Sequence, residues 1–197
     1  PETNPYVEHA YTTVTLDKRI KNKKILQQKF NLPERDDVFI ASIVARLSEQ
    51  KGLDLVLQTI EPLLNNFDFQ FIVVGSGESK YTSFFKQLDK KYSQVATHLS
   101  YDETLPHMVY SGADLILIPS RFEPSGLTQM EAMRYGLVPL VRKTGGLSDS
   151  VIDFNPLTNT GTGFVFEKYD QYAFFGAFIR ALETYKHPTV WRNIQER

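Results

Sequence analysis

Short apolar runs alternate with helical patterns along most of this chain of 197 residues, and that alternation limits its fold more than any other feature. Six runs have the apolar content of buried strands: residues 39–44, 69–74, 95–99, 114–118, 138–141 and 164–166. Apolar residues recur at helical spacing in residues 53–64, around Phe84 to Leu88, and in residues 103–111, 127–135, 147–152 and 172–185. Strands that alternate with helices form parallel sheets through right-handed crossovers. We therefore expect an α/β fold built on an open parallel sheet.

The first residues lie outside this alternation. Residues 1–16 contain prolines and show no clear period, so we expect an extended lead-in followed by one domain over residues 17–197. The chain opens without a methionine, which suggests a fragment of a longer protein.

Asp17 is placed to cap a first helix that runs to about Phe30. In this helix Ile20, Ile25 and Phe30 share one face. The lysine run from Lys18 to Lys24 is more typical of a solvated helix face than of an anion site.

The charges of the chain nearly cancel, with 22 Lys and Arg against 23 Asp and Glu and a net charge of -1. This balance removes any whole-chain electrostatic argument for nucleic acid or an anionic membrane as a partner. The chain has no cysteine, which excludes disulfides and thiolate metal sites. No apolar run approaches the roughly 20 residues that a membrane-spanning helix needs, and the first residues lack a signal-peptide pattern.

The stretch from Ile118 to Gly136, reading IPSRFEPSGLTQMEAMRYG, joins a buried strand to the start of a helix. In a parallel sheet this junction lies where ligands bind and where free N–H groups favour anions. It carries Glu123 before the helix and Glu131 about one turn into it. Each glutamate taken singly is more typical of a solvated surface position. Whether the two glutamates belong to a ligand-binding site or to an ordinary surface depends on the residues in the neighbouring loops.

Those other loops supply complementary groups at the same edge of the sheet. Arg46 and Lys51 would neutralise a diphosphate, and the backbone N–H groups at Gly126 to Thr128 would hydrogen-bond it. Tyr101 would stack on a base, and Thr144 to Gly146 form a further turn. The sequence thus predicts one crevice that suits a nucleotide.

With a nucleotide in this crevice, the two glutamates gain distinct roles. Glu131 would accept hydrogen bonds from ribose hydroxyls, and Glu123 would face whatever is attached beyond the phosphates. The turn from Gly75 to Gly77 allows either close approach of a ligand or simply a tight turn. It lacks the third glycine of a dinucleotide-binding fingerprint, because Lys80 stands there.

The sequence lacks the residue patterns that several kinds of catalysis and metal binding require. No Asp-x-Asp pair occurs, so no carboxylate clamp for a divalent ion is evident, and neither a metal nor a cofactor is expected. Glu123 stands where a G-x-S-x-G nucleophile turn has its first glycine, which disfavours a serine nucleophile. The four histidines lie far apart and are expected to be structural or surface residues: His9, His98, His107 and His187.

The stretches VARLSEQKGLDL and PSRFEPSGLTQMEAMRYGLVPLVRKTGGLSDSV closely resemble the glycogen and starch synthases. The resemblance runs from about Asn4 to Arg197 and is densest over residues 46–54 and 120–151. The E-P-x-G-L core with a later glutamate is shared by many retaining glycosyltransferases of the same fold. The family implies two Rossmann-like domains, each a parallel sheet with helices on both faces, in the GT-B arrangement. This chain resembles the C-terminal, donor-binding half.

The resemblance also implies roles for individual residues. Arg46 and Lys51 match the cations that hold the donor diphosphate and stabilise the leaving group. Glu123 matches the first carboxylate of a paired-glutamate motif, near the transferred glucose, and Glu131 matches the second, near the ribose. Tyr101 matches the aromatic residue that stacks on the base. The remaining matches are the helix-start amides of Leu127 and Thr128 and the loop of Thr144, Gly145 and Gly146 near the sugar and distal phosphate.

The implied activity is transfer of glucose from ADP-glucose to the nonreducing end of an α-1,4-glucan with retention of configuration. The acceptor glucan would bind mainly to an N-terminal domain outside this chain, so the chain alone should be inactive. The implied compartment is the cytoplasm of a bacterium or the plastid stroma of a plant or alga. Two alternatives stay open: a retaining glycosyltransferase with a small acceptor, and a non-catalytic nucleotide- or glucan-binding scaffold. The choice between ADP and UDP is also open, because a stacked tyrosine accepts any base.

Overall fold

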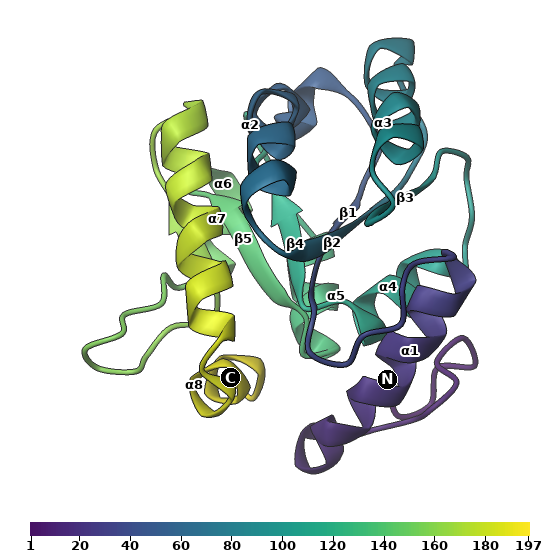
Figure 1. The fold of residues 1–197 in the computed structure, drawn as a ribbon. Coiled ribbons are helices and arrows are strands. Elements are labelled where there is room, and N and C mark those ends of the chain that lie inside the picture. The colour runs from purple at the N-terminus through teal and green to yellow at the C-terminus, as the bar shows by residue number, and fades with distance from the viewer.

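The computed structural model describes residues 1–197 and is built on a six-stranded sheet in which every neighbouring pair of strands is parallel (Figure 1). The strands are β1 (Phe39–Val44), β2 (Phe69–Val74), β3 (Val95–His98), β4 (Leu115–Ile118), β5 (Val138–Arg142) and β6 (Phe164–Phe166). Each lies within one residue of its expected bounds. The open parallel α/β sheet predicted from the sequence is therefore confirmed.

The strand order is β3-β2-β1-β4-β5-β6, so the direction of winding reverses at β1. The chain leaves β1 toward β2 on one side and leaves β4 toward β5 on the other. Two connections that diverge in this way open a crevice at the carboxyl ends of their strands, which is where open α/β sheets bind ligands.

Eight helices and two short 3-10 helices complete the fold. The α-helices are α1 (Arg19–Lys29), α2 (Leu53–Asn66), α3 (Ser79–Lys91), α4 (Leu105–Gly112), α5 (Thr128–Arg134), α6 (Gly145–Ser150), α7 (Gln171–Tyr185) and α8 (Pro188–Gln195). The 3-10 helices are η1 (Thr13–Lys18) and η2 (Glu49–Lys51). None of these helices combines the length and the apolar character that crossing a membrane requires.

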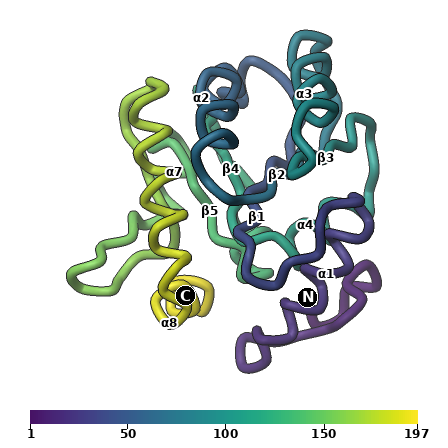
Figure 2. The backbone as a smooth tube through the Cα atoms, viewed as in Figure 1, coloured from purple at the N-terminus to yellow at the C-terminus, as the bar shows by residue number.

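The helices cover both faces of the sheet, because successive strand residues point to opposite sides. In β1, Phe39, Ala41 and Ile43 pack into one apolar core together with α2, α3, α7 and α8. Ile40 packs into a second core with α1, α4, α5 and α6. Figure 2 follows the chain through this arrangement. Burial on both faces explains why the strands are continuous apolar runs rather than alternating ones.

The face of α1 that Ile20, Ile25 and Phe30 share is not the buried face of the helix. Its buried residues are Arg19, Asn22, Lys23, Leu26 and Gln27. Ile20 is exposed. The polar face is satisfied by its surroundings: the Arg19 guanidinium donates to four carbonyl oxygens that follow or end α4 and α5. Carbonyls at helix ends lack intrahelical partners, so a buried arginine is stable there.

One lysine of the run from Lys18 to Lys24 also contradicts the expectation of a solvated face. The ammonium group of Lys23 lies 2.8 Å from the carboxylate of Asp114, and the two side chains are only 4% and 11% exposed. Lys18 and Lys24 are exposed as expected. A buried lysine needs such a partner, and here Asp114 supplies it from the start of β4.

The lead-in is less extended than its sequence suggests. Residues 13–18 form η1, so Asp17 lies inside a 3-10 helix and does not cap α1. Val7 and Tyr11 are buried in the core that contains α1 and α4. The segment therefore packs on the domain instead of running free of it.

Two helix starts are shifted from their expected positions. Helix α4 begins at Leu105, because Asp102 accepts hydrogen bonds from the backbone N–H groups of Leu105 and Thr104 at 2.9 and 2.7 Å. These bonds lower the pKa of Asp102 and fix the turn that carries Tyr101. Helix α6 begins at Gly145, so the expected loop of residues 144–146 is largely the first turn of a helix.

Candidate active site

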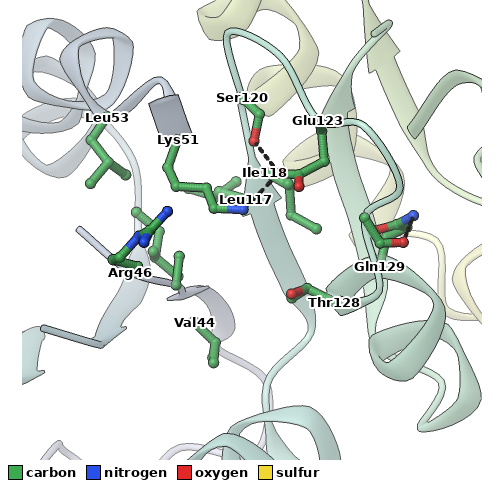
Figure 3. A pocket seen from close by; sticks show the side chains of 13 residues that line it. Val44, Arg46, Lys51, Leu53, Leu117, Ile118, Ser120, Glu123, Thr128 and Gln129 are labelled. Carbon is green, nitrogen blue, oxygen red and sulfur yellow. Dashed lines mark hydrogen bonds and ion pairs between the residues drawn. The ribbon is translucent and has the colours of Figure 1, made fainter. Parts of the chain in front are cut away.

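Two cavities lie at the carboxyl ends of the strands, one at β1 and β4 and the other at β1 and β2. The first, of about 390 Å³, has Lys51 and Glu123 in its wall, and we name it the glutamate cavity (Figure 3). The second, of about 580 Å³, is lined by Tyr101 and Tyr110, and we name it the tyrosine cavity. Four residues line both: Val44, Ala45, Arg46 and Thr128. The two cavities therefore adjoin, and a ligand with two parts would fit across them.

The glutamate cavity is organised by one carboxylate. The ammonium group of Lys51 donates to Oε2 of Glu123 at 2.6 Å, and the hydroxyl of Ser120 donates to the same oxygen at 3.1 Å (Figure 3). The side chains of Lys51 and Glu123 are 22% and 11% exposed, so this charge-assisted contact is well shielded. The other oxygen, Oε1, has no hydrogen-bond partner in the protein. It is available to a ligand.

Arg46 supplies the positive charge that this pair does not cancel. It lines both cavities, is exposed, and makes no hydrogen bond or ion pair within the protein. Since Lys51 and Glu123 neutralise each other, the guanidinium of Arg46 leaves the glutamate cavity with a net attraction for anions.

Lys51 is brought to Glu123 by a close contact between two strand ends. Gly52 has a φ of 68°, in the left-handed region, and a Cβ built on it would lie 1.9 Å from the carbonyl oxygen of Pro119. Glycine alone meets both conditions. The turn before α2 therefore sits directly on the end of β4 and sets the distance between the two charges.

The loop that carries Glu123 is fixed through its carbonyl oxygens. Arg142, at the end of β5, donates from Nε to the carbonyl of Ser120 at 2.8 Å and from Nη2 to the carbonyl of Arg121. The backbone N–H of Gly146 donates to the carbonyl of Glu123 at 3.0 Å. These bonds restrict the backbone of the loop, so the backbone position from which the Glu123 side chain extends is fixed.

Tyr169 supports the same loop from outside. Its ring lies 4.8 Å from the guanidinium carbon of Arg121 and 5.5 Å from that of Arg142. Burial, followed by its hydrogen bond to Asp54, raises the pKa of the Tyr169 hydroxyl. The hydroxyl therefore keeps its proton and donates to Asp54 while accepting from Nε of Arg121 at 3.0 Å.

Thr144, Gly145 and Gly146 lie behind this loop and not in the wall of either cavity. A Cβ on Gly145 would lie 2.1 Å from the carbonyl oxygen of Glu123, and one on Gly146 would lie 1.9 Å from that of Ser125. The first turn of α6 thus packs directly against the backbone that follows β4. Close packing accounts for both glycines.

The turn at Gly75 and Gly77 has the same kind of explanation. A Cβ on Gly75 would lie 1.9 Å from the carbonyl oxygen of Ala45, and one on Gly77 would lie 2.1 Å from that of Leu47. The backbone N–H of Leu47 also donates to the carbonyl of Ser76 at 2.8 Å. Close packing therefore accounts for both glycines, and Gly75 and Ser76 also line the tyrosine cavity.

The tyrosine cavity has an exposed ring and a buried one. Tyr101 is 79% exposed, and its hydroxyl donates to Glu103 at 3.1 Å. Tyr110 is only 4% exposed. Burial, and after it the negative charge of Glu131, raises the pKa of Tyr110, so its hydroxyl stays protonated at neutral pH. Glu131, on α5, makes no hydrogen bond through its side chain and faces the same cavity.

The structure brings most of the predicted site residues together. Arg46, Lys51, Glu123, Gly126 and Thr128 line the glutamate cavity, and Tyr101, Glu131, Arg46 and Thr128 line the tyrosine cavity. Leu127 is 65% exposed and lines neither. No group of three or more His, Asp or Glu side chains is arranged to hold a metal ion.

Sequence reasoning missed Ser120, Arg142, His107 and Tyr110. Ser120 and Arg142 stand at strand ends beside predicted site residues, and that position was an available signal. His107 and Tyr110 are three residues apart on one face of α4. The same spacing occurs in helix faces that pack into a core, so it does not by itself indicate the wall of a cavity.

The family model for glycosyl transferases group 1 matches residues 23–197. The chain belongs to this family. Among curated members, the glycogen synthases of Geobacillus stearothermophilus and Synechocystis sp. are 41% and 38% identical to it over the whole chain. The chain spans 41% and 42% of the length of these two relatives.

Solved structures agree with the family assignment. The catalytic domain of starch synthase IV from Arabidopsis thaliana, solved with ADP and acarbose, matches the whole chain with a TM-score of 0.91 and 34% identity. The match covers 42% of that protein's chain. Sucrose-phosphate synthase from Thermosynechococcus elongatus matches 90% of this chain and 45% of its own, with a TM-score of 0.66 and 24% identity. The second likeness shows a shared fold alone.

Proposed function

We propose that this group 1 glycosyl transferase is the donor-binding part of a glycogen or starch synthase, which transfers glucose from ADP-glucose to the nonreducing end of an α-1,4-glucan with retention of configuration. The observation that carries the proposal is the adjoining pair of cavities, one with Arg46 and the Lys51–Glu123 pair and the other with two tyrosines. The identity to glycogen synthases supports the proposed activity, and the ADP-bound starch synthase supports the proposed nucleotide.

In this proposal the diphosphate lies in the glutamate cavity. Arg46 and Lys51 neutralise it, and the backbone N–H groups of Gly126, Leu127 and Thr128 hydrogen-bond it. Leu127 contributes only its backbone, which is consistent with its exposed side chain. As the bond to glucose breaks, negative charge grows on the leaving diphosphate, and fixed cations stabilise that charge more than water would.

The glucose of the donor would meet Glu123. Lys51 and Ser120 hold one oxygen of this carboxylate, so the free oxygen Oε1 can bind the sugar or stabilise its developing positive charge. Glu131 would hydrogen-bond the ribose and Tyr101 would stack on the base. Thr144, Gly145 and Gly146 would act near the sugar through the loop on which they pack.

The glucan acceptor would bind mainly to a part of the protein outside this chain, because the chain spans about two fifths of its relatives. We propose residues 1–16 as the link to that part and residues 17–197 as the donor-nucleotide domain. The isolated chain would bind the donor without turning it over. The proposed compartment is the cytoplasm in a bacterium or the plastid stroma in a plant or alga.

Thermal unfolding of this chain with separate ligands tests the proposal. A ligand at 100 times its Kd stabilises the native state by about 2.7 kcal/mol, which raises Tm by about 5–10 °C for a chain of this size. We expect ADP to give such a rise and maltooligosaccharide to give little. A rise with glucan and none with any nucleotide would favour a scaffold, and a larger rise with UDP than with ADP would correct the donor.

A further inference from the structure

The hydroxyl of Tyr110, a residue that lines the tyrosine cavity, has no hydrogen-bond partner in the protein. Tyr110 is 4% exposed, and its ring packs against the rings of His107 and Tyr135, with centroid distances of 6.2 and 5.8 Å. No group of the protein hydrogen-bonds its hydroxyl, yet this oxygen is not sealed from the cavity that Tyr110 lines. A hydroxyl both donates and accepts, so this one is free to bind a polar group of a ligand.

His107 offers a second free group on the same wall. Asn4 accepts a hydrogen bond from the backbone N–H of Tyr6 at its oxygen Oδ1, which fixes its amide nitrogen as the atom that faces His107 and Tyr135. That nitrogen lies 3.2 Å from Nδ1 of His107 and donates to the Tyr135 hydroxyl at 2.7 Å. Because an amide nitrogen only donates, Nδ1 must accept.

The tautomer of His107 follows from this contact. The Tyr135 hydroxyl, which accepts from Asn4, lies 3.2 Å from Nδ1 and is placed to donate to it as well. A neutral imidazole whose Nδ1 accepts carries its proton on Nε2. Nε2 has no partner in the protein, and His107 lines the tyrosine cavity. His107 therefore has an N–H donor that the protein leaves unpaired, and its ring lies 6.2 Å from that of Tyr110 in the lining of the same cavity.

The two groups share one face of α4, since residues three apart on a helix are neighbours. Tyr101, in the turn before α4, offers an aromatic ring to the same cavity. A planar heterocycle stacked on that ring has polar atoms only at its edge. The α4 wall supplies the hydrogen-bonding groups that such an edge requires.

We propose that the Tyr110 hydroxyl and Nε2–H of His107 hydrogen-bond the edge of the nucleobase, an inference that rests on the nucleotide-binding function proposed above. The N–H requires an acceptor on the base, such as a ring nitrogen or a carbonyl oxygen. The two residues act in base recognition and not in phosphate or sugar binding.

Isothermal titration of this chain with ADP and with ribose 5-diphosphate, which lacks the base, isolates that role. Tyr110→Phe removes only the hydroxyl. We expect it to weaken ADP binding by about three- to tenfold, the usual effect of one neutral hydrogen bond, and to leave ribose 5-diphosphate unchanged. Tyr81→Phe is the matched control, because Tyr81 is 1% exposed on α3 and lines neither cavity.

A pair of substitutions tests His107 separately. The amide nitrogen of glutamine can take the place of Nε2, whereas that of asparagine matches Nδ1. We expect His107→Asn to weaken ADP binding about as much as Tyr110→Phe does, and His107→Gln to retain most of the affinity. Melting temperatures of the free variants report any loss of the Asn4 and Tyr135 contacts independently of the ligand.

The outcomes separate the two proposals. If the unsubstituted chain binds neither ADP nor ribose 5-diphosphate, the proposed function fails and the inference fails with it. If the chain binds ADP but Tyr110→Phe and His107→Asn leave that affinity unchanged, only the inference fails. If these variants lose affinity for ADP and for ribose 5-diphosphate equally, the inference also fails, because the residues would then act on the diphosphate that both ligands share or through the fold.

Discussion

At the scale of single residues, the chemistry proposed for the site depends on what Lys51 binds. Its ammonium group donates to Glu123 at 2.6 Å. A diphosphate in the glutamate cavity would compete with Glu123 for that ammonium, because both are anions within reach of one side chain. The carboxylate of Glu123 is therefore expected to weaken nucleotide binding, although it is also proposed to bind the sugar or stabilise its charge.

Glu123→Gln should for this reason bind ADP more tightly than the unsubstituted chain, by about three- to tenfold. The substitution removes a negative charge from the cavity and releases Lys51, at nearly constant shape. Isothermal titration measures the change. Weaker binding by this variant would mean that the Lys51–Glu123 pair orders the cavity for the phosphates instead of competing with them.

Lys51→Ala should have the opposite effect. It removes a cation and leaves the charge of Glu123 uncompensated, so we expect ADP affinity to fall by at least about tenfold, the lower end of a charge-assisted hydrogen bond. Lys91→Ala is the control, since Lys91 pairs with Glu61 on the surface and lines neither cavity. Unchanged affinity in Lys51→Ala would remove Lys51 from the proposed diphosphate site.

At the scale of elements, the glutamate loop is positioned by close contact with the start of α6. The backbone N–H of Gly146 donates to the carbonyl of Glu123, and there is no room for a side chain between the two elements. This contact makes the proposed catalytic geometry sensitive to residues that touch no ligand.

Gly146→Ala should destabilise the domain by about 1–3 kcal/mol, the usual cost of forced overpacking, because its Cβ would lie 1.9 Å from the carbonyl oxygen of Ser125. Gly176→Ala in α7 is a matched control, with no heavy atom within 4 Å of the added Cβ. There the same change should stabilise by about 0.5–1 kcal/mol. Urea unfolding measures both, and similar stabilities for the two variants would contradict the packing described for α6.

Elements with strong patterns were predictable from the sequence, and those held by polar contacts were not. The strands are buried on both faces and so appear as unbroken apolar runs. The buried face of α1 is instead specified by distant carbonyls and by Asp114, which no local spacing reveals. Arg46, Lys51, Glu123 and Glu131 follow strands that could be recognised, whereas the partners of Arg142 and His107 depend on the folded chain.

At the scale of the whole molecule, the Lys23–Asp114 pair ties the two faces of the sheet together. Lys23 belongs to α1, Asp114 precedes β4, and the ammonium group also donates to the hydroxyl of Tyr185, on α7, at 2.8 Å. Helices α1 and α7 pack into different apolar cores. One buried cation thus links both layers at the amino ends of the strands.

Lys23→Met should lower the free energy of unfolding by about 3–5 kcal/mol, because it leaves Asp114 buried without its cation. Lys24→Met, one position along, removes a lysine that is 46% exposed and 3.2 Å from Asp36, and should change stability by less than about 1 kcal/mol. Thermal unfolding compares the two. Equal melting temperatures would show that the buried pair contributes no more than a surface one.

The central claim, that the two cavities together hold a nucleoside diphosphate, is tested most directly by a crystal structure of this chain with ADP. The account predicts the diphosphate in the glutamate cavity within hydrogen-bond distance of Arg46 and Lys51, and the adenine in the tyrosine cavity beside Tyr101. ADP bound elsewhere on the domain, or with its phosphates away from both cations, would contradict it.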